Sequence, residues 1–104
     1  MTVIYGIKTC DTCRKAAKAL AVDLYDIRAN PLSREQLERF YQNFGAALVN
    51  TRSTTWRGLS EAERGRDPLD LLTDHPTLMK RPVIEKDGTL YLGWGKDVQT
   101  AVLG

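Results

Sequence analysis

The two cysteines of the chain, Cys10 and Cys13, stand three positions apart in the stretch YGIKTCDTCRKAAKAL, residues 5–20. Such a pair can carry thiol–disulfide chemistry, supply half of a metal site, or consist of two small buried residues without chemistry. A closed structural zinc site needs four ligands, and the only histidine, His75, lies far along the chain. We therefore expect no metal, and redox chemistry and simple burial remain as the alternatives.

Composition and charge are those of one soluble globular domain. The 104 residues are enough for a hydrophobic core, and 42% hydrophobic and 27% charged residues are ordinary values. A formal net charge of +2 does not indicate nucleic-acid binding. No apolar run reaches membrane-spanning length and no signal-peptide pattern is present, so we expect a cytoplasmic monomer without membrane contact. In the cytoplasm, a lone cysteine pair is more typical of catalysis or redox function than of a permanent disulfide.

The segments around the cysteines predict a strand, a helix and a second strand. Residues 2–7, TVIYGI, are β-branched and aromatic, as in strands. Residues 11–21 place alanine and leucine on one face of a helix, and residues 23–29 alternate as a strand does. Strand, helix and strand within about 30 residues form a βαβ unit, in which the two strands are parallel.

The middle of the chain, residues 31–79, predicts helices without strands. Three helix starts are marked by capping residues, at Ser33, Ser60 and Asp67. Each serine is followed three residues later by Gln or Glu, the spacing of a capping box. Asp67 is followed by proline, which is favoured at the first helical position. Gly45 is expected to end the first of these helices.

The last part of the chain predicts a β-hairpin and a terminal helix. Residues 81–94, RPVIEKDGTLYLGW, have two apolar stretches around Asp87-Gly88, and residues 96–103 are amphipathic. The predicted order is β-α-β, a helical insert at about 31–79, and β-β-α, in a single α/β domain over 1–104. A parallel pair and an antiparallel hairpin in one mixed sheet form the thioredoxin-like plan. In that plan, a redox Cys-x-x-Cys is expected at the first strand-to-helix junction.

Cys10 is expected where the first helix begins. Free backbone N–H groups and the helix dipole favour an anion there, and the thiolate is the reactive form of cysteine. Thiols so placed have pKa values of about 3.5 to 7.5 instead of about 8.5, and Lys8, Arg14 and Lys15 add positive charge. We therefore expect Cys10 to be an ionised nucleophile. Cys13, one turn further, either resolves a disulfide formed at Cys10 or is a buried residue without chemistry.

Three blocks of the chain resemble the arsenate reductase-like family, which comprises glutaredoxin-linked arsenate reductases and Spx-type regulators. They are residues 5–20, LVNTRSTTWRGL at 48–59 and LMKRPVI at 78–84. The NTR, TTWR and KRP elements are most similar to the small reductase-like members of obscure function. The resemblance implies a thioredoxin-like fold and a thiol-dependent reductase. It implies glutathione as a co-substrate rather than a bound cofactor, and glutaredoxin as a candidate partner.

The resemblance also implies roles for single residues. Cys10 matches the family's nucleophile, and Pro82 matches a proline with a cis peptide bond. Arg52 and Arg81 match two arginines that hold an oxyanion or a thiolate, and the rigid fork of a guanidinium suits that role. The candidate site therefore has Cys10 and Cys13 as catalytic residues, with Lys8, Arg14, Arg52, Arg81 and Pro82 as substrate-binding residues.

The chain departs from the arsenate reductases at a third arginine, which these enzymes carry after the hairpin. Residues 90–98, LYLGWGKDV, offer only Lys96, and an ammonium group does not replace a guanidinium fork. This incomplete cradle argues against efficient arsenate reduction.

Three functional hypotheses follow. The first is a reductase acting on a small oxyanion or a thiol/disulfide substrate, with Cys13 or glutathione in the resolving step. The second is an Spx-type redox-sensing regulator that binds RNA polymerase. The third is a thioredoxin-like domain whose cysteine centre is inactive.

Overall fold

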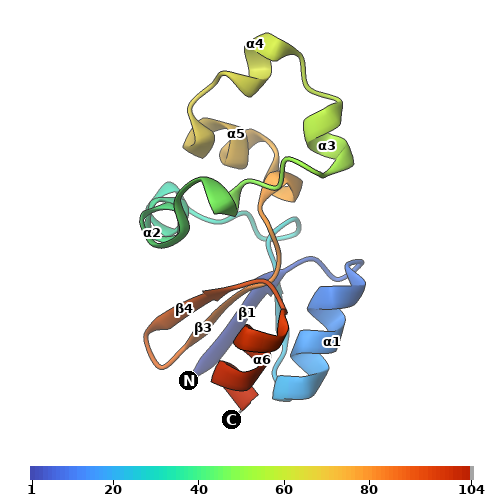
Figure 1. Ribbon diagram of the computed structural model, residues 1–104, viewed down its shortest axis with the longest axis vertical. Coiled ribbons are helices and arrows are strands. Elements are labelled where there is room, and N and C mark those ends of the chain that lie inside the picture. Colours follow the sequence, from blue (N-terminus) through green and yellow to red (C-terminus); the bar gives the residue numbers. More distant parts are fainter. Residues whose placement is uncertain (104) are drawn as a thin grey trace. The chain divides into compact units, whose positions relative to one another are not determined.

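The computed structural model describes residues 1–103, which form two compact units (Figure 1). The first unit comprises Met1–Asn30 together with the chain from Arg81 onward, and the second comprises Pro31–Lys80. The second unit corresponds to the helical insert predicted at about 31–79. Within residues 1–103, no helix is long and apolar enough to cross a membrane.

The first unit contains a four-stranded mixed sheet in the order β2-β1-β3-β4. Its strands are β1 Thr2–Gly6, β2 Leu24–Asp26, β3 Val83–Lys86 and β4 Thr89–Leu92. β1 pairs in parallel with β2 and antiparallel with β3, which in turn pairs antiparallel with β4. The predicted parallel pair and hairpin are thus confirmed. The second strand is shorter than predicted, because the chain turns after Asp26, whose carbonyl oxygen accepts from the Asn30 N–H at 2.9 Å.

Two helices cover one face of this sheet, α1 (Asp11–Leu20) and α6 (Lys96–Leu103) (Figure 1). Ile4 and Ile84 lie opposite each other on β1 and β3 and form the sheet side of the core. Ala16 of α1 and Val98 of α6 form the helix side. This packing fixes the start of α1 at the end of β1, which is the junction that carries the cysteines.

The second unit consists of short helical segments. These are α2 Arg34–Phe44, η1 Gly45–Leu48, α3 Thr54–Arg57, α4 Glu61–Arg64, α5 Pro68–Asp74 and η2 Pro76–Leu78. The predicted caps are confirmed, because the side chains of Ser33, Ser60 and Asp67 each accept a hydrogen bond from a backbone N–H of the first turn. The sequence prediction lacked α3, whose cap is Ser53.

Candidate active site

Cys10 is the N-cap residue of α1, as predicted from the sequence. Its backbone is extended, with φ −88° and ψ 117°, and its N–H donates to the Ile7 carbonyl oxygen at 3.0 Å. Its carbonyl oxygen accepts from the Arg14 N–H at 3.0 Å, which begins the hydrogen-bond ladder of α1. Cys10 is partly exposed to solvent, in contrast to Cys13, which is buried.

Cys13 lies three residues further, on the face of α1 that packs against the sheet. Its side chain is 0% exposed. Its sulfur occupies the space above Gly6 at the end of β1, where an added Cβ would lie only 2.5 Å from Sγ. A glycine at position 6 is therefore what allows the thiol of Cys13 to fit between the helix and the sheet.

The surroundings of Cys10 favour its thiolate. Partial burial raises the pKa of this thiol, but hydrogen bonding to the amide and thiol of Cys13 and to Arg81, with the positive charge of Arg81, outweighs burial and lowers it. The free N–H groups of the first helical turn favour an anion in the same way.

The surroundings of Cys13 have the opposite effect. The pKa of the Cys13 thiol is raised to about 11, mainly by burial and also by the neighbouring Cys10, although a hydrogen bond from the Ile7 backbone and the charge of Arg81 lower it. Cys13 is therefore protonated at neutral pH and can donate its S–H to the Cys10 thiolate. The two thiols differ in acidity because Cys10 is partly solvated and lies beside the cationic Arg81, whereas Cys13 is buried.

Of the predicted substrate-binding residues, Arg81 lies within hydrogen-bonding reach of Cys10. Lys8, Arg14 and Pro82 have other contacts. The Lys8 side chain is exposed, while its backbone N–H donates to Asp26. Arg14 is 60% exposed and pairs with Asp11. Pro82 is buried and follows a cis peptide bond, as the resemblance implied. Substrate binding by these residues stays a prediction.

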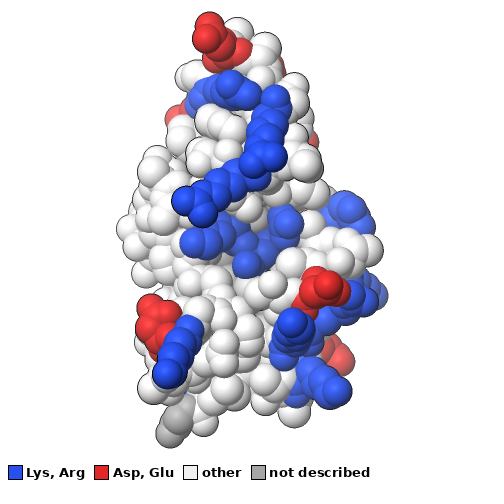
Figure 2. Space-filling model, turned by 45° about the vertical axis from the view of Figure 1, so that its right-hand side comes forward, with Lys and Arg blue, Asp and Glu red and all other residues white. Residues whose placement is uncertain are grey.

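Arg52 belongs to the second unit. It is exposed, and its backbone N–H donates to the Asn50 side-chain oxygen at 3.1 Å, in the turn before α3. Figure 2 shows Lys and Arg side chains gathered on one face of the second unit (upper half of the view). The exposed arginines of that unit include Arg57 and Arg64 as well as Arg52. The role of Arg52 as an anion ligand likewise stays a prediction.

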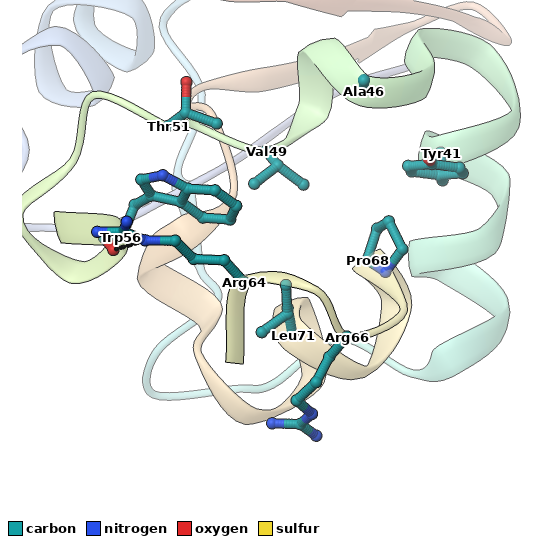
Figure 3. A pocket seen from close by; sticks show the side chains of 9 residues that line it. All are labelled: Tyr41, Ala46, Val49, Thr51, Trp56, Arg64, Arg66, Pro68 and Leu71. Carbon is teal, nitrogen blue, oxygen red and sulfur yellow. Dashed lines mark hydrogen bonds between the residues drawn. The ribbon is translucent and has the colours of Figure 1, made fainter. Parts of the chain in front are cut away.

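The second unit also contains an apolar pocket that the sequence did not predict. It has a volume of about 170 Å³, and its lining includes Tyr41, Val49, Trp56 and Leu71 (Figure 3). The Arg64 guanidinium lies 5.7 Å from the centre of the Trp56 ring. Trp56 thus lines an open pocket, whereas Trp94 is partly buried and packs against the core of the first unit. In the described part of the chain, no group of three His, Cys, Asp or Glu side chains could hold a metal ion.

Sequence reasoning missed one residue beside this site, Asp26. It is 7% exposed and is the one buried charged side chain among residues 1–103. It ends β2, next to the point where β1 leaves the sheet. An acidic residue at a strand end gives no sign in sequence that its carboxylate is buried, so no pattern could have singled it out.

A four-stranded mixed sheet with helices on one face, and a Cys-x-x-Cys pair at the β1–α1 junction, define a thioredoxin-like fold. Comparison with known proteins makes the assignment more specific. Residues 5–101 match the model of the ArsC family, so the chain belongs to this family. An uncharacterised protein of Haemophilus influenzae is 41% identical, over 97% of this chain and 98% of its own length.

Further relatives place the chain among proteins related to arsenate reductase. The solved structure of the YffB protein is 33% identical, covers 100% of both chains and superposes with a TM-score of 0.89. An arsenate reductase (ArsC)-related protein of Brucella melitensis is 35% identical, over 96% of this chain and 92% of its own, with a TM-score of 0.73. The global transcriptional regulator Spx of Streptococcus pyogenes is 30% identical, over 99% of this chain and 85% of its own.

The hydrogen bond between the two thiols leads to a testable difference between two substitutions of Cys13. Cys13→Ala removes the S–H donor and is expected to slow the reaction of Cys10 with iodoacetamide at pH 6 by about three- to tenfold, because a lost donor disfavours the thiolate. Cys13→Ser keeps an O–H donor and should retain a faster rate than Cys13→Ala. Equal rates in wild type and both variants, measured by mass spectrometry, would contradict a role for the Cys13 thiol.

Proposed function

We propose that this protein is a thiol-dependent reductase in which the Cys10 thiolate is the nucleophile. The observation that carries this proposal is a partly exposed thiol at a helix N-terminus, whose pKa is lowered by Cys13 and Arg81. A thiolate populated near neutral pH is what attack on a disulfide or an oxidised substrate requires. Membership of the ArsC family and similarity to an arsenate reductase-related protein support the same reaction class.

The first step is attack of the Cys10 thiolate on one sulfur of a disulfide R–S–S–R′. A new Cys10–S–S–R bond forms, the original S–S bond breaks, and R′S⁻ leaves with the electron pair. The cationic Arg81 beside Cys10 would balance the negative charge that moves from Cys10 to the leaving sulfur. The same guanidinium suits a carboxylate of glutathione or an oxyanion as its ligand, with Arg52 as a second proposed ligand.

The second step restores Cys10 by attack of a second thiol. If glutathione resolves the intermediate, its thiolate attacks the R sulfur, the disulfide R–S–S–G forms, and Cys10 leaves as the thiolate. If Cys13 resolves it, RS⁻ leaves, and the resulting Cys10–Cys13 disulfide must be reduced by two electrons from an external thiol. Full burial and a pKa raised to about 11 make Cys13 a poor nucleophile at neutral pH, which favours glutathione in this step.

The test is turnover of a mixed disulfide between glutathione and a small thiol, with glutathione as reductant, in wild type and in Cys10→Ser. We expect turnover in wild type and loss of it in Cys10→Ser, while Cys13→Ser retains it. Unchanged turnover in Cys10→Ser would refute the proposal, as would a Cys10 thiol that titrates with the pKa of a free cysteine.

Arsenate in place of the disulfide substrate is expected to be reduced slowly, because the chain lacks the third arginine that arsenate reductases carry after the hairpin.

A second candidate function is an Spx-type redox-sensing regulator, favoured by the 30% identity to a global transcriptional regulator and by the Cys10–Cys13 pair. Oxidation of that pair would change the surface around the start of α1. The test is retention of the RNA polymerase α subunit on the immobilised protein, under oxidising and under reducing conditions. Retention in one state supports this function, and no retention in either state dismisses it.

A further inference from the structure

Asp26 holds two loops of the first unit with one buried carboxylate. Its Oδ1 accepts from the N–H groups of Arg28 at 2.8 Å and Ala29 at 3.1 Å, within its own turn. Its Oδ2 accepts from the N–H of Lys8 at 3.1 Å, eighteen residues away in the loop that leads to Cys10. Each carboxylate oxygen thus serves a different loop, and only Oδ2 reaches the loop of the reactive thiol.

The neighbouring contacts reinforce this link. Asp26 is in register with Gly6 across the parallel pair, and the Ile27 N–H donates to the Gly6 carbonyl oxygen at 2.9 Å. The Arg28 side chain reaches Thr9 Oγ1 at 3.4 Å. The chain between Gly6 and Cys10 is therefore held by hydrogen bonds to the end of β2 and to the residues that follow it.

The carboxylate is ionised wherever the thiols titrate. Hydrogen bonds from the amides of Lys8, Ala29 and Arg28, with the charge of Arg28, lower the pKa of Asp26 against the effect of burial. Burying a charged carboxylate destabilises the folded protein unless hydrogen bonds satisfy its oxygens. Here it accepts three backbone donors, and the geometry it fixes is that of the loop before Cys10.

We propose that Asp26 is a positioning residue for Cys10, acting through its hydrogen bond to the Lys8 amide. The inference rests on the proposed role of Cys10 as the reactive thiol. By fixing the loop Ile7–Cys10, Asp26 sets where the Cys10 sulfur lies relative to its two stabilising groups, Cys13 and Arg81. Asp26 touches neither substrate nor the reacting sulfur.

Replacing Asp26 removes a negative charge and also removes the anchor of the loop before Cys10. These two changes have opposite effects on the reaction rate of the Cys10 thiol, and this makes the proposal testable. Asp26→Asn removes a negative charge, which by Coulomb's law alone favours the thiolate and speeds its reaction at pH 6. It also places an amide NH₂ against one of the backbone donors, which breaks that anchor. Positioning therefore predicts the reverse, a reaction slower by about threefold or more at pH 6 and a pH profile displaced to higher pH.

The experiment measures the iodoacetamide reaction of Cys10 from pH 5 to 9 in wild type, Asp26→Asn and the control Asp23→Asn, each checked for folding by circular dichroism. Asp23 is exposed, and Asp23→Asn removes one negative charge, as Asp26→Asn does, three residues earlier in the chain. A slower Cys10 in folded Asp26→Asn, with Asp23→Asn like wild type, supports positioning. An unchanged or faster Cys10 in folded Asp26→Asn overturns it. A wild type without a fast-reacting thiol would instead refute the proposed function.

A second variant and a wild-type measurement keep the test decisive if Asp26→Asn does not fold. Asp26→Ser leaves a hydroxyl that can still accept from the Arg28 amide within the turn but is too short to reach Lys8, so it removes the loop anchor selectively. The same slowing of Cys10 is expected. In wild type, the Lys8 amide should be protected from hydrogen exchange, and exchange at the rate of a free amide would overturn the inference.

Discussion

Replacing Arg81 by alanine is expected to slow the reaction of Cys10 with iodoacetamide at pH 6 by about three- to tenfold and to displace its pH profile to higher pH. Arg81 lowers the pKa of Cys10 both by hydrogen bonding and by its charge. A hydrogen bond to a charged group contributes about 1.5–3 kcal/mol, and about 1.4 kcal/mol corresponds to a tenfold change in the thiolate fraction. Because a more basic thiolate is also more nucleophilic, part of this loss is recovered in the observed rate.

The reagent and the controls isolate the effect of Arg81 on the sulfur. Iodoacetamide is uncharged, so the loss of a cation does not change its attraction to the site. Arg81→Lys keeps the charge without the fork and should lie between wild type and Arg81→Ala. Lys18→Ala removes one exposed charge from the last turn of α1 and should behave like wild type. If Arg81→Ala also behaved like wild type, the Arg81 side chain would have no part in stabilising the thiolate.

The sequence was most informative where a structural role depends on neighbours in the chain. The N-caps at Ser33 and Ser60 are local, because a side chain and an amide three residues later form the hydrogen bond. The hairpin at Asp87-Gly88 is local too, since both residues have positive φ, 51° and 86°. The position of Cys10 at the start of α1 follows in the same way, from a strand pattern that ends just before a helix pattern begins.

The sequence was least informative where a role depends on residues far apart in the chain. The burial of Asp26 depends on its register with Gly6, and the pocket of the second unit depends on how α2, α3 and α5 meet. Arg14 is closer in sequence to Cys10 than Arg81, yet it pairs with Asp11, while Arg81 acts on the thiol. Proximity in sequence indicated Arg14 as the cation beside Cys10. The pairing of β3 with β1 instead places Arg81, which precedes β3, near the Cys10 thiol.

The second large effect is expected from Gly6→Ala, which should destabilise the protein by about 1–3 kcal/mol or more. A Cβ at this position would lie 2.5 Å from Cys13 Sγ, 3.0 Å from Cys13 Cβ and 3.2 Å from Leu24 Cδ1. The backbone of Gly6 is that of a β-strand, which any residue adopts, so the cost is one of space alone. Relief of the clash would move α1 away from the sheet and, with it, the amide and thiol of Cys13 that stabilise the Cys10 thiolate.

Urea unfolding would measure the free-energy change, with Gly58→Ala as the matched control. Gly58 has φ −79°, and an added Cβ would find its nearest neighbour at 3.5 Å, so this variant should be neutral or slightly stabilised. Combining Gly6→Ala with Cys13→Ala removes the sulfur and leaves the contact at 3.0 Å, so part of the lost stability should return. Equal stability of Gly6→Ala and Gly58→Ala would show that α1 does not press Cys13 against the sheet. Partial recovery in the double variant would show that the thiol itself fills the space that glycine leaves open.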